Sequence, residues 1–540
     1  MLPEERAECE SKLTKAMCSL GLGGNALSNP ELIDFINCLR PSYKLPHRNT
    51  FNKLVEQEFN KTAFMVRQAV EDASFVAVCA DGYTDIAHQH VYNVICLAPK
   101  PYLWTTVETT SDSETSSFLA NLLKKEIEKI GKEKVVALIT DHASNIRGAA
   151  LQLQVDYPWL IVSGCKAHLL NLLARDICEK TVVINLIKDC AMITKFFRQK
   201  EPQAVFWAAQ QEDGTTKKQL TFAAPTRWST YCDVFERFML NKSAIESAIH
   251  SPTLARKFTK EIENMKEVFE PSNQFWRILQ SLLDILKPIS NLINFVESDD
   301  NFVGTVFDKI DQCFDQLDAV VSSSLMNREF LDFVKERIEF RRTMGTSSLP
   351  DLIYSMDPTK FPDPNCLDEN VLKLDQTRRN KAADFLNSYF SKNPKIGPEV
   401  NQEFAKFTGK CSPFNKDVKP QAWTQQGTND MKVFWLGYYQ GTRLSKVMAA
   451  IIPMVLSSAA AERNFSIRGA IHTKSRNRLA IKHVNHQTFI KHNLKLLRPP
   501  KAADSESESE NEDVAAAEED AEQTDPNNDE LFDDSSIFID

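Results

Sequence analysis

Residues 75–109 read FVAVCADGYTDIAHQHVYNVICLAPKPYLWTTVET. They contain three β-type apolar runs, Phe75–Ala80, Val91–Leu97 and Tyr102–Thr109, which turn-like residues separate. The first run stops at Asp81. Three short runs this close together can pair antiparallel, so this stretch predicts the first part of a sheet.

The pattern after residue 109 alternates between helix and strand. In chain order it predicts an amphipathic helix over Ser113–Ile130, a buried strand over Val135–Thr140 that ends at Asp141, a helix over Asn145–Val155, a strand over Trp159–Val162 and helices over about Lys166–Arg198. The resulting order, β-β-β-α-β-α-β-α, predicts an α/β fold: a mixed sheet with helices on its faces.

The rest of the chain predicts helices. Asn29-Pro30 starts a helix with one apolar stripe, and a second helix follows near Thr50–Asp72. From about Tyr231 to Val447 we find no convincing strand, and amphipathic helices are predicted over Leu444–Ser457 and Leu479–Leu497. The predicted regions are a helical N-terminal region (1–72), the first part of the α/β core (73–230), an all-helical insertion (231–440), C-terminal core helices (441–500) and an acidic tail (501–540).

Composition bounds the class of protein. The chain has 540 residues, of which 42% are hydrophobic, so it is long enough for several domains with an ample core. It contains no apolar run of the about 18 residues that a membrane span needs, and its charged start lacks a signal-peptide segment. The twelve cysteines fall mostly singly, which favours a reducing, intracellular compartment.

The net charge of −9 hides two opposite parts. Residues 504–540 carry sixteen Asp/Glu and no Lys/Arg, so residues 1–503 carry 64 basic and 57 acidic groups, a net of +7. A mildly basic body permits nucleic-acid binding without requiring it. The tail is expected to be disordered, as a solubilising end, a competitor of DNA or a binding segment for a protein partner.

Two apolar strands of the predicted sheet each end in an aspartate, Asp81 and Asp141. Ligands collect at the carboxyl ends of strands in open α/β sheets, and two carboxylates there can share divalent cations. The alternative is that each aspartate only marks the turn from strand to loop.

A third acid stands in Ser457–Leu479, SSAAAERNFSIRGAIHTKSRNRL, where Glu462 follows a run of small residues. Five basic side chains come after it: Arg463, Arg468, Lys474, Arg476 and Arg478. An acid beside a basic strip suits metal-bound phosphate chemistry, but a helix with a solvated face gives the same pattern.

Several stretches together resemble the hAT superfamily of DNA transposases and their domesticated relatives. They are ADGYTD, LITDHASNIRGA, Cys165-Lys-Ala-His168-Leu-Leu-Asn171, Pro225-Thr-Arg-Trp228-Ser and the segment around Glu462, in the order of the family. The resemblance covers roughly residues 20–497. It implies a ribonuclease H-like core that a large all-α insertion interrupts, and a nuclear protein that binds DNA.

The resemblance also implies site residues. Asp81, Asp141 and Glu462 match the catalytic triad of the family, which binds two Mg²⁺ or Mn²⁺ ions for DNA cleavage and strand transfer. Arg227 and Trp228 match a pair that contacts DNA, the Trp stacking on a flipped base, and the five basic residues after Glu462 are further candidate DNA contacts. Cys165 and His168 match a supporting pair; we expect no zinc there, because a four-ligand set is incomplete. The region also forms a dimer interface in the family, to which we assign Leu479, Val484, Phe489, Ile490 and Leu494.

The chain departs from the family in two respects. Residues 1–60 lack the paired Cys and His spacing of a BED zinc finger, which puts sequence-specific docking on DNA in doubt. Tyr83 stands where Trp is common.

Three functions therefore stay open. The first is a DDE-type DNA transposase or nuclease that dimerises or forms a higher oligomer. The second is a domesticated, non-catalytic nuclear factor that binds DNA or proteins. The third is a nuclease for RNA–DNA hybrids, against which the long insertion argues.

Overall fold

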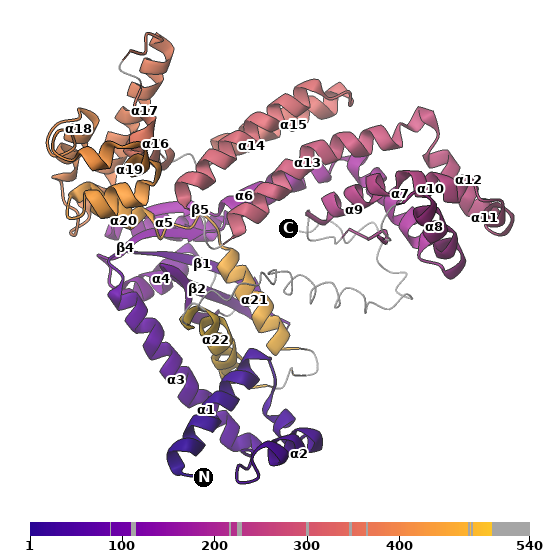
Figure 1. Cartoon of the computed structure of the whole chain (residues 1–540), viewed down its shortest axis with the longest axis horizontal. Helices are drawn as coiled ribbons and strands as arrows, with labels where there is room; N and C mark the ends of the chain where they lie inside the picture. Colours follow the sequence, from indigo (N-terminus) through magenta and orange to yellow (C-terminus); the bar gives the residue numbers. More distant parts are fainter. Residues whose placement is uncertain are drawn as a thin grey trace. The chain divides into compact units, whose positions relative to one another are not determined.

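Five strands form one mixed sheet in the computed structural model of the chain (Figure 1). β1, β2 and β3 pair antiparallel in succession, whereas β4 pairs parallel with both β1 and β5, so the order across the sheet is β3-β2-β1-β4-β5. The strands are β1 (Val76–Thr84), β2 (His90–Ala98), β3 (Lys100–Thr109), β4 (Val135–Thr140) and β5 (Ile161–Gly164). The predicted mixed sheet is confirmed.

The structure describes residues 1–86, 88–109, 115–214, 218–223, 229–298, 302–344, 348–362, 365–473, 476 and 479–498. Met1–Leu497 forms one compact unit and Arg498–Asp540 a second. The predicted disordered tail, residues 501–540, lies outside the described residues. Among the described residues, no helix combines the length and the apolar character needed to cross a membrane.

Continuous apolar runs explain the two central strands. All six residues of β4 are buried, and so are the first five of β1, because both strands are covered on two faces. β1 nevertheless runs past the predicted end at Ala80, because β2 pairs with it as far as Thr84, opposite His90. Asp81 therefore lies inside β1, at the point where the pairing with β4 ends.

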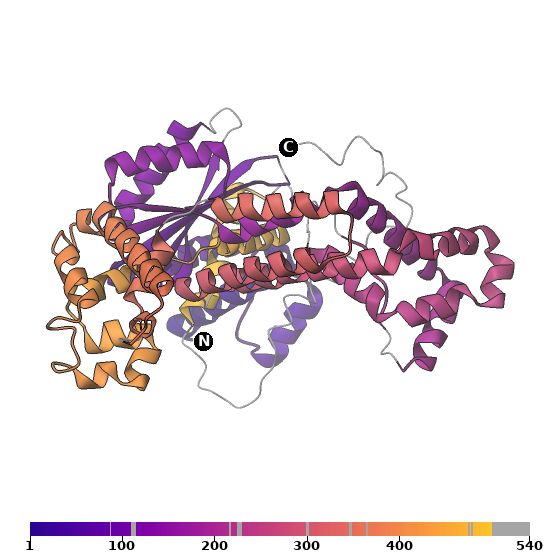
Figure 2. The same ribbon diagram turned by 90° about the horizontal axis from the view of Figure 1, so that it is seen from above.

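Helices cover both faces of the sheet. α4 (Ser116–Ile130) and α5 (Ser144–Asp156) pack on each other and lie on one face, and the C-terminal helices lie on the other (Figure 2). The latter are α21 (Ala459–Ile471) and α22 (Ile481–Leu497), whereas α20 (Arg443–Ile451) packs against α18 (Val400–Thr408). α20 ends earlier than the predicted Ser457, because Pro453 has no backbone N–H with which to continue the helical hydrogen bonds.

The N-terminal helices pack against α22. They are α1 (Pro3–Ser19), the short η1 (Gly24–Ser28), α2 (Pro30–Leu39) and α3 (Arg48–Asp72), and both α1 and α3 contact α22. α2 begins where the sequence predicts: the Asn29 side chain accepts a hydrogen bond from the Leu32 amide at 3.1 Å, and Pro30 occupies the first helical position.

Between β5 and α20, every element in the described part of the chain is helical, as predicted. The α-helices are α6 (Lys166–Cys178), α7 (Thr181–Phe197), α8 (Lys200–Glu212), α9 (Ser229–Leu240), α10 (Lys242–Ile249), α11 (Pro252–Lys257), α12 (Thr259–Val268), α13 (Phe275–Glu297), α14 (Val303–Ser323), α15 (Arg328–Thr343), α16 (Leu349–Met356), α17 (Glu369–Ser388), α18 (Val400–Thr408) and α19 (Gln425–Asn429). The short helical segments are η3 (Pro271–Asn273), η4 (Pro358–Lys360), η5 (Phe390–Lys392), η6 (Pro420–Trp423) and η7 (Val433–Tyr438). Contacts of α6 with α13 and α15 join this block to the sheet region.

Candidate functional site

Strand pairing brings Asp81 and Asp141 to the same end of the sheet. Ala80 of β1 pairs in parallel with Thr140 of β4, and each aspartate is the next residue of its chain segment. Backbone amides orient both carboxylates: Asp81 Oδ1 accepts from the Gly82 N–H at 2.9 Å, and Asp141 Oδ1 accepts from the Ala143 N–H at 3.1 Å. The two predicted strand-end acids are therefore neighbours across β1 and β4.

Glu462 reaches this end of the sheet from the first turn of α21, which runs alongside β1 and β2 (Figure 1). The helix begins with Ala459–Ala461, which are buried and small enough for a close approach to the sheet. Farther along, the Asn93 amide donates to Asn464 Oδ1 at 2.7 Å, and the rings of Tyr83 and Phe465 lie 4.1 Å apart.

The three acids share one electrostatic neighbourhood. Burial, together with the negative charges of Glu462 and then Asp141, raises the pKa of Asp81 to about 7. Hydrogen bonds from the Ser458 hydroxyl and the Gly82 amide act in the opposite direction on this pKa. The shift indicates that the negative charge of these carboxylates is not fully compensated, which is typical of functional sites.

A cavity of about 210 Å³ opens beside the two aspartates. Asp81, Asp141 and Asn145 line it together with Tyr92 and neighbouring residues of β1 and α5. The Tyr92 ring lies against Gly82, where an added Cβ would meet Cε1 at 2.7 Å, so the absent side chain leaves room for the ring. The carboxylates are thus accessible: Asp81 and Asp141 are half-buried, and Glu462 is exposed.

The thiol of Cys165 ties the segments of the site together. Its Sγ accepts from the His168 N–H at 3.3 Å, and from the amide and the hydroxyl of Ser458 at 3.2 and 3.3 Å. The same Ser458 hydroxyl lies 3.2 Å from Glu462 Oε1, and the Cys165 amide donates to the Thr140 carbonyl at 2.7 Å. This junction joins the end of β4, the start of α6 and the start of α21.

Two histidines flank the junction. The rings of His142 and His168 lie 5.6 Å apart, and His142 Nε2 lies 3.2 Å from the Cys165 carbonyl oxygen. Gly164 leaves space for His142, since an added Cβ would lie 2.3 Å from its Cε1. Burial lowers the pKa of His168, whereas the charges of Asp141 and Glu462 raise it.

The donor set suits a hard divalent cation. Mg²⁺ is usually held by one or two carboxylates, with water and substrate phosphate oxygens completing its shell. Asp81 and Asp141 offer such a pair beside a cavity. Within the described residues, however, no three His, Cys, Asp or Glu side chains are arranged to hold one metal ion by themselves.

The predicted basic strip divides into different environments. Arg463 is exposed, and its Nη1 donates to the Glu297 carbonyl at 2.9 Å. Arg476 donates to the Gly21 carbonyl at 2.5 Å and is half-buried. The other candidate DNA contacts Arg227, Trp228, Lys474 and Arg478 lie outside the described residues.

Arg468 is enclosed by the protein, with a side chain that is 1% exposed. Its Nη2 lies 3.4 Å from Asp85 Oδ2 and 3.9 Å from Glu108 Oε1, and Nη1 donates to Asn485 Oδ1. His472 Nδ1 lies 3.7 Å from the same Asp85 oxygen. The predicted contact of Arg468 with DNA does not fit this placement, because its charge already faces buried carboxylate inside the chain.

The predicted dimerisation side chains also pack inside the chain. Val484, Phe489 and Ile490 are buried, and Leu479 and Leu494 are half-buried. Ile490 belongs to a small cluster, called here the N-terminal core, whose other buried members are Met17, Cys18, Leu27, Phe51 and Val55. In the described part of the chain, these side chains stabilise the packing of α22 and of the segment just before it against the rest of the same chain.

Sequence reasoning missed two residues at these sites. Ser458, which contacts Cys165 and Glu462, is an ordinary polar residue before a helix. Asp85 lies only four residues after Asp81, but it pairs with a residue 383 positions away, which no local pattern indicates.

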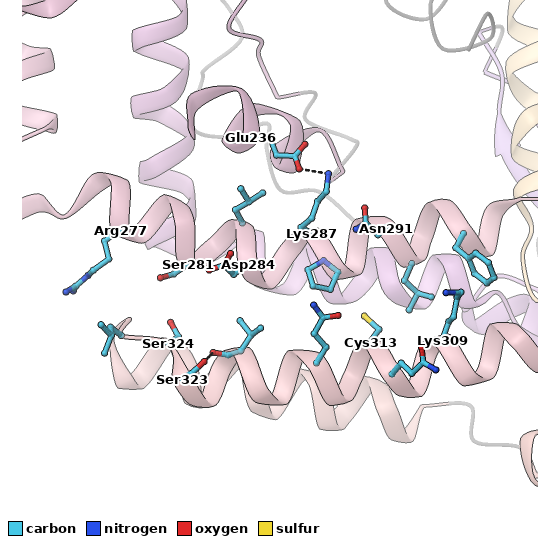
Figure 3. Close-up of a pocket in the computed structure, with 18 residues that line it drawn as sticks. Glu236, Arg277, Ser281, Asp284, Lys287, Asn291, Lys309, Cys313, Ser323 and Ser324 are labelled. Atoms are coloured by element: carbon cyan, nitrogen blue, oxygen red, sulfur yellow. Dashed lines mark hydrogen bonds and ion pairs between the residues drawn. The ribbon is translucent and has the colours of Figure 1, made fainter. Parts of the chain in front are cut away.

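A larger hollow of about 880 Å³ lies between α13 and α14 (Figure 3). Its cations Arg277, Lys287 and Lys309 are accompanied by the acids Glu236 and Asp284, and Glu236 pairs with Lys287 at 2.5 Å. The three carboxylates at the sheet end do not line this groove. Its three cations and two acids leave a net charge of +1, so it does not suit a metal cation, and the sheet end is the stronger candidate for a cation site.

Two family models match parts of the chain that meet at the site. A domain of unknown function (DUF659) matches residues 47–193, which include both aspartates, and the hAT family C-terminal dimerisation region matches residues 442–494, which include Glu462. None of the curated proteins matches the chain. With the resemblance of its motifs, these matches support a hAT-family transposase-like protein.

Proposed function

We propose that the chain is a DNA-processing protein of the transposase type, with a divalent-metal site at Asp81, Asp141 and Glu462. One observation carries the proposal: acids from positions 81, 141 and 462 share one electrostatic neighbourhood beside a cavity. The sheet supports the expected ribonuclease H-like core, because three antiparallel strands are followed by two strands in parallel pairing.

In this proposal, Asp81 and Asp141 supply the oxygen ligands for two Mg²⁺ or Mn²⁺ ions. When bound, such ions activate the attacking oxygen and stabilise the leaving oxygen of a DNA phosphodiester. The chain orients its own ligands: the amides of Gly82 and Ala143 each donate to one oxygen of an aspartate, and the Ser458 hydroxyl also hydrogen-bonds Asp81. Glu462 is held by Ser458 at the accessible side of the site.

Nuclear location and DNA as the substrate belong to the same proposal. The net charge of +7 on residues 1–503 supports attraction of the DNA backbone. Trp228 stays our proposed stacking residue for an extruded base. Self-association is supported by the match to the dimerisation region.

Nicking of supercoiled plasmid or hairpin DNA in the presence of Mn²⁺ tests the proposal. We expect cleavage by the wild type and its loss in Asp81→Asn, Asp141→Asn and Glu462→Gln. Asp156→Asn is the matched control, because Asp156 is an exposed α5 acid paired with Lys124 at 2.7 Å. Absence of nicking by the wild type, or equal nicking by Asp81→Asn, would overturn the proposal that the chain cleaves DNA at this site.

A second candidate function is a non-catalytic factor that self-associates and binds DNA or proteins. It is favoured by the absence, among the described residues, of three side chains placed to hold a metal ion. The same assay separates the two functions, since this factor would bind duplex DNA in a gel-shift experiment without nicking it. Cleavage of an RNA–DNA hybrid in place of duplex DNA would support the third function.

A further inference from the structure

α2 carries an apolar face that its own chain leaves largely uncovered. In this ten-residue helix, five apolar residues recur at helical spacing and form one broad stripe. None of its residues is buried, and Phe35 and Leu39 are 58% and 66% exposed. The stripe consists of Leu32, Ile33, Phe35, Ile36 and Leu39.

The charged residues of α2 lie on a different side of the helix from its apolar residues. Glu31 and Asp34 lie away from the stripe, so charged and apolar residues are segregated on the helix. Such segregation normally accompanies burial of the apolar side against a partner. An exposed apolar face of this kind marks an interaction site.

The matched dimerisation region offers no comparable surface. Among its described residues, 442–473, 476 and 479–494, no large hydrophobic side chain is exposed. Val484, Phe489 and Ile490 are turned into the chain. Self-association through apolar contacts therefore requires another surface of the described chain, or opening of this region.

α2 and the matched dimerisation region, residues 442–494, pack on the same small core. Leu32 of α2 and Leu494 of α22 both pack on the N-terminal core. Arg476, also within the matched region, donates to the Gly21 carbonyl just before η1, against which α2 packs. α2 and the segment matched by the dimerisation model are thus joined through one small core, with the exposed Phe35 and Leu39 on the side of α2 that this core leaves uncovered.

We propose that α2 is a self-association face that packs on α2 of a second copy of this chain. The inference rests on the self-association part of the proposed function and locates it on a segment outside both family matches. The contact would be isologous, with the same apolar stripe on each side. In an antiparallel arrangement, Glu31 at the start of one helix would approach the end of the other, where Arg40 pairs with Glu5 of its own chain at 3.1 Å.

The size of the face sets the expected strength. A helix of ten residues is about 15 Å long, so α2 alone covers less than the roughly 800 Å² per partner of a typical stable interface. The dimer is therefore expected to depend on concentration. Phe35 and Leu39, as the most exposed large side chains of the stripe, carry most of its affinity.

Sedimentation velocity of the full chain over a wide concentration range tests this interface. We expect a monomer–dimer equilibrium whose dissociation constant rises at least about tenfold in Phe35→Asp/Leu39→Asp. The matched control is Val371→Asp/Leu374→Asp, which changes two apolar residues of α17 that are 46% and 56% exposed. All four positions are exposed, so each variant is expected to fold, which circular dichroism checks.

A direct contact measurement accompanies the sedimentation. With a photo-crosslinking residue at position 39 and a mixture of ¹⁴N- and ¹⁵N-labelled chains, we expect mixed-isotope crosslinks that map to residues 30–40. Equal dimerisation of the α2 variant and the wild type overturns the inference and leaves self-association standing. A wild type that stays monomeric overturns both the α2 interface and self-association. Crosslinks within one chain only, or to another protein, overturn the proposal that a second copy of the chain packs on α2.

Discussion

The two ends of α21 carry charges in opposite arrangements. At its start, Glu462 adds a negative charge to those of Asp81 and Asp141, and burial together with these charges raises the pKa of Asp81 to about 7. Near its end, Arg468 lies between the acids Asp85 and Glu108. One end gathers like charges at an accessible place, and the other pairs opposite charges inside the protein.

The difference separates a candidate site from a structural contact. Like charges held together oppose folding unless a ligand compensates them, so they point to a cation. A buried ion pair is already compensated, and its loss leaves a charge without a partner. Charge balance and exposure, taken together, therefore distinguish acids and bases that the sequence shows as one mixed cluster.

Removal of Arg468 is expected to have the largest effect on stability. Arg468→Met leaves Asp85 buried without its guanidinium, which should lower the free energy of unfolding by about 3–5 kcal/mol. Denaturant unfolding measures this change. Arg463→Met, at an exposed position of the same helix, should cost less than about 0.5 kcal/mol. Similar losses in the two variants would remove the contrast between the ends of α21.

Asp81→Asn is expected to stabilise the metal-free protein at high pH. The pKa of Asp81 is about 7 in the folded chain and near 3.8 otherwise, so the folded state binds a proton more tightly between these values. Stability should therefore fall as pH rises from about 4 to about 7, with a slope of at most about 1.4 kcal/mol per pH unit from this group.

Asp81→Asn lacks this contribution to the pH dependence of the free energy of unfolding. At pH 8 it should be more stable than the wild type by up to about 4 kcal/mol, and at pH 3.5 the two should be nearly equal. Thermal unfolding across this pH range, with chelator present, measures the difference, and Asp156→Asn serves as the control. Parallel pH profiles of Asp81→Asn and the wild type would contradict the proposed repulsion between the carboxylates.

Ser458→Ala is expected to have the smallest effect. It removes the hydroxyl that contacts Cys165 Sγ and Glu462 Oε1, at a cost of about 1 kcal/mol in unfolding free energy. It should also raise the pKa of Asp81 further, because the Ser458 hydrogen bond lowers it. Ser466→Ala, at an exposed position of α21, should leave both quantities unchanged.

Much of the fold follows from local pattern. The runs FVAVCA and VVALIT are long enough and apolar enough to predict buried strands, and their ends predict the placement of Asp81 and Asp141. Strand limits were less accurate, since β1 continues to Thr84 only because β2 supports it. Helix limits shifted where proline intervened, as after Ile451.

The site could be predicted only in part. No local pattern relates Glu462 to Asp81, and the family resemblance supplied that link. Arg468 looked like its neighbours in the basic strip, because sequence spacing does not show which side of α21 the sheet covers. Its partner Asp85 comes from a distant segment, so the pairing depends on tertiary packing.

The central claim is that the uncompensated carboxylates form a divalent-cation site. The most direct measurement is Mn²⁺ binding to the full-length protein, followed by electron paramagnetic resonance, in the wild type, Asp81→Asn, Asp141→Asn, Glu462→Gln and the control Asp156→Asn. We predict binding by the wild type and the control, and affinities at least about tenfold weaker in the three site variants. Absence of binding by the wild type, or equal affinity in Asp81→Asn, would contradict the claim.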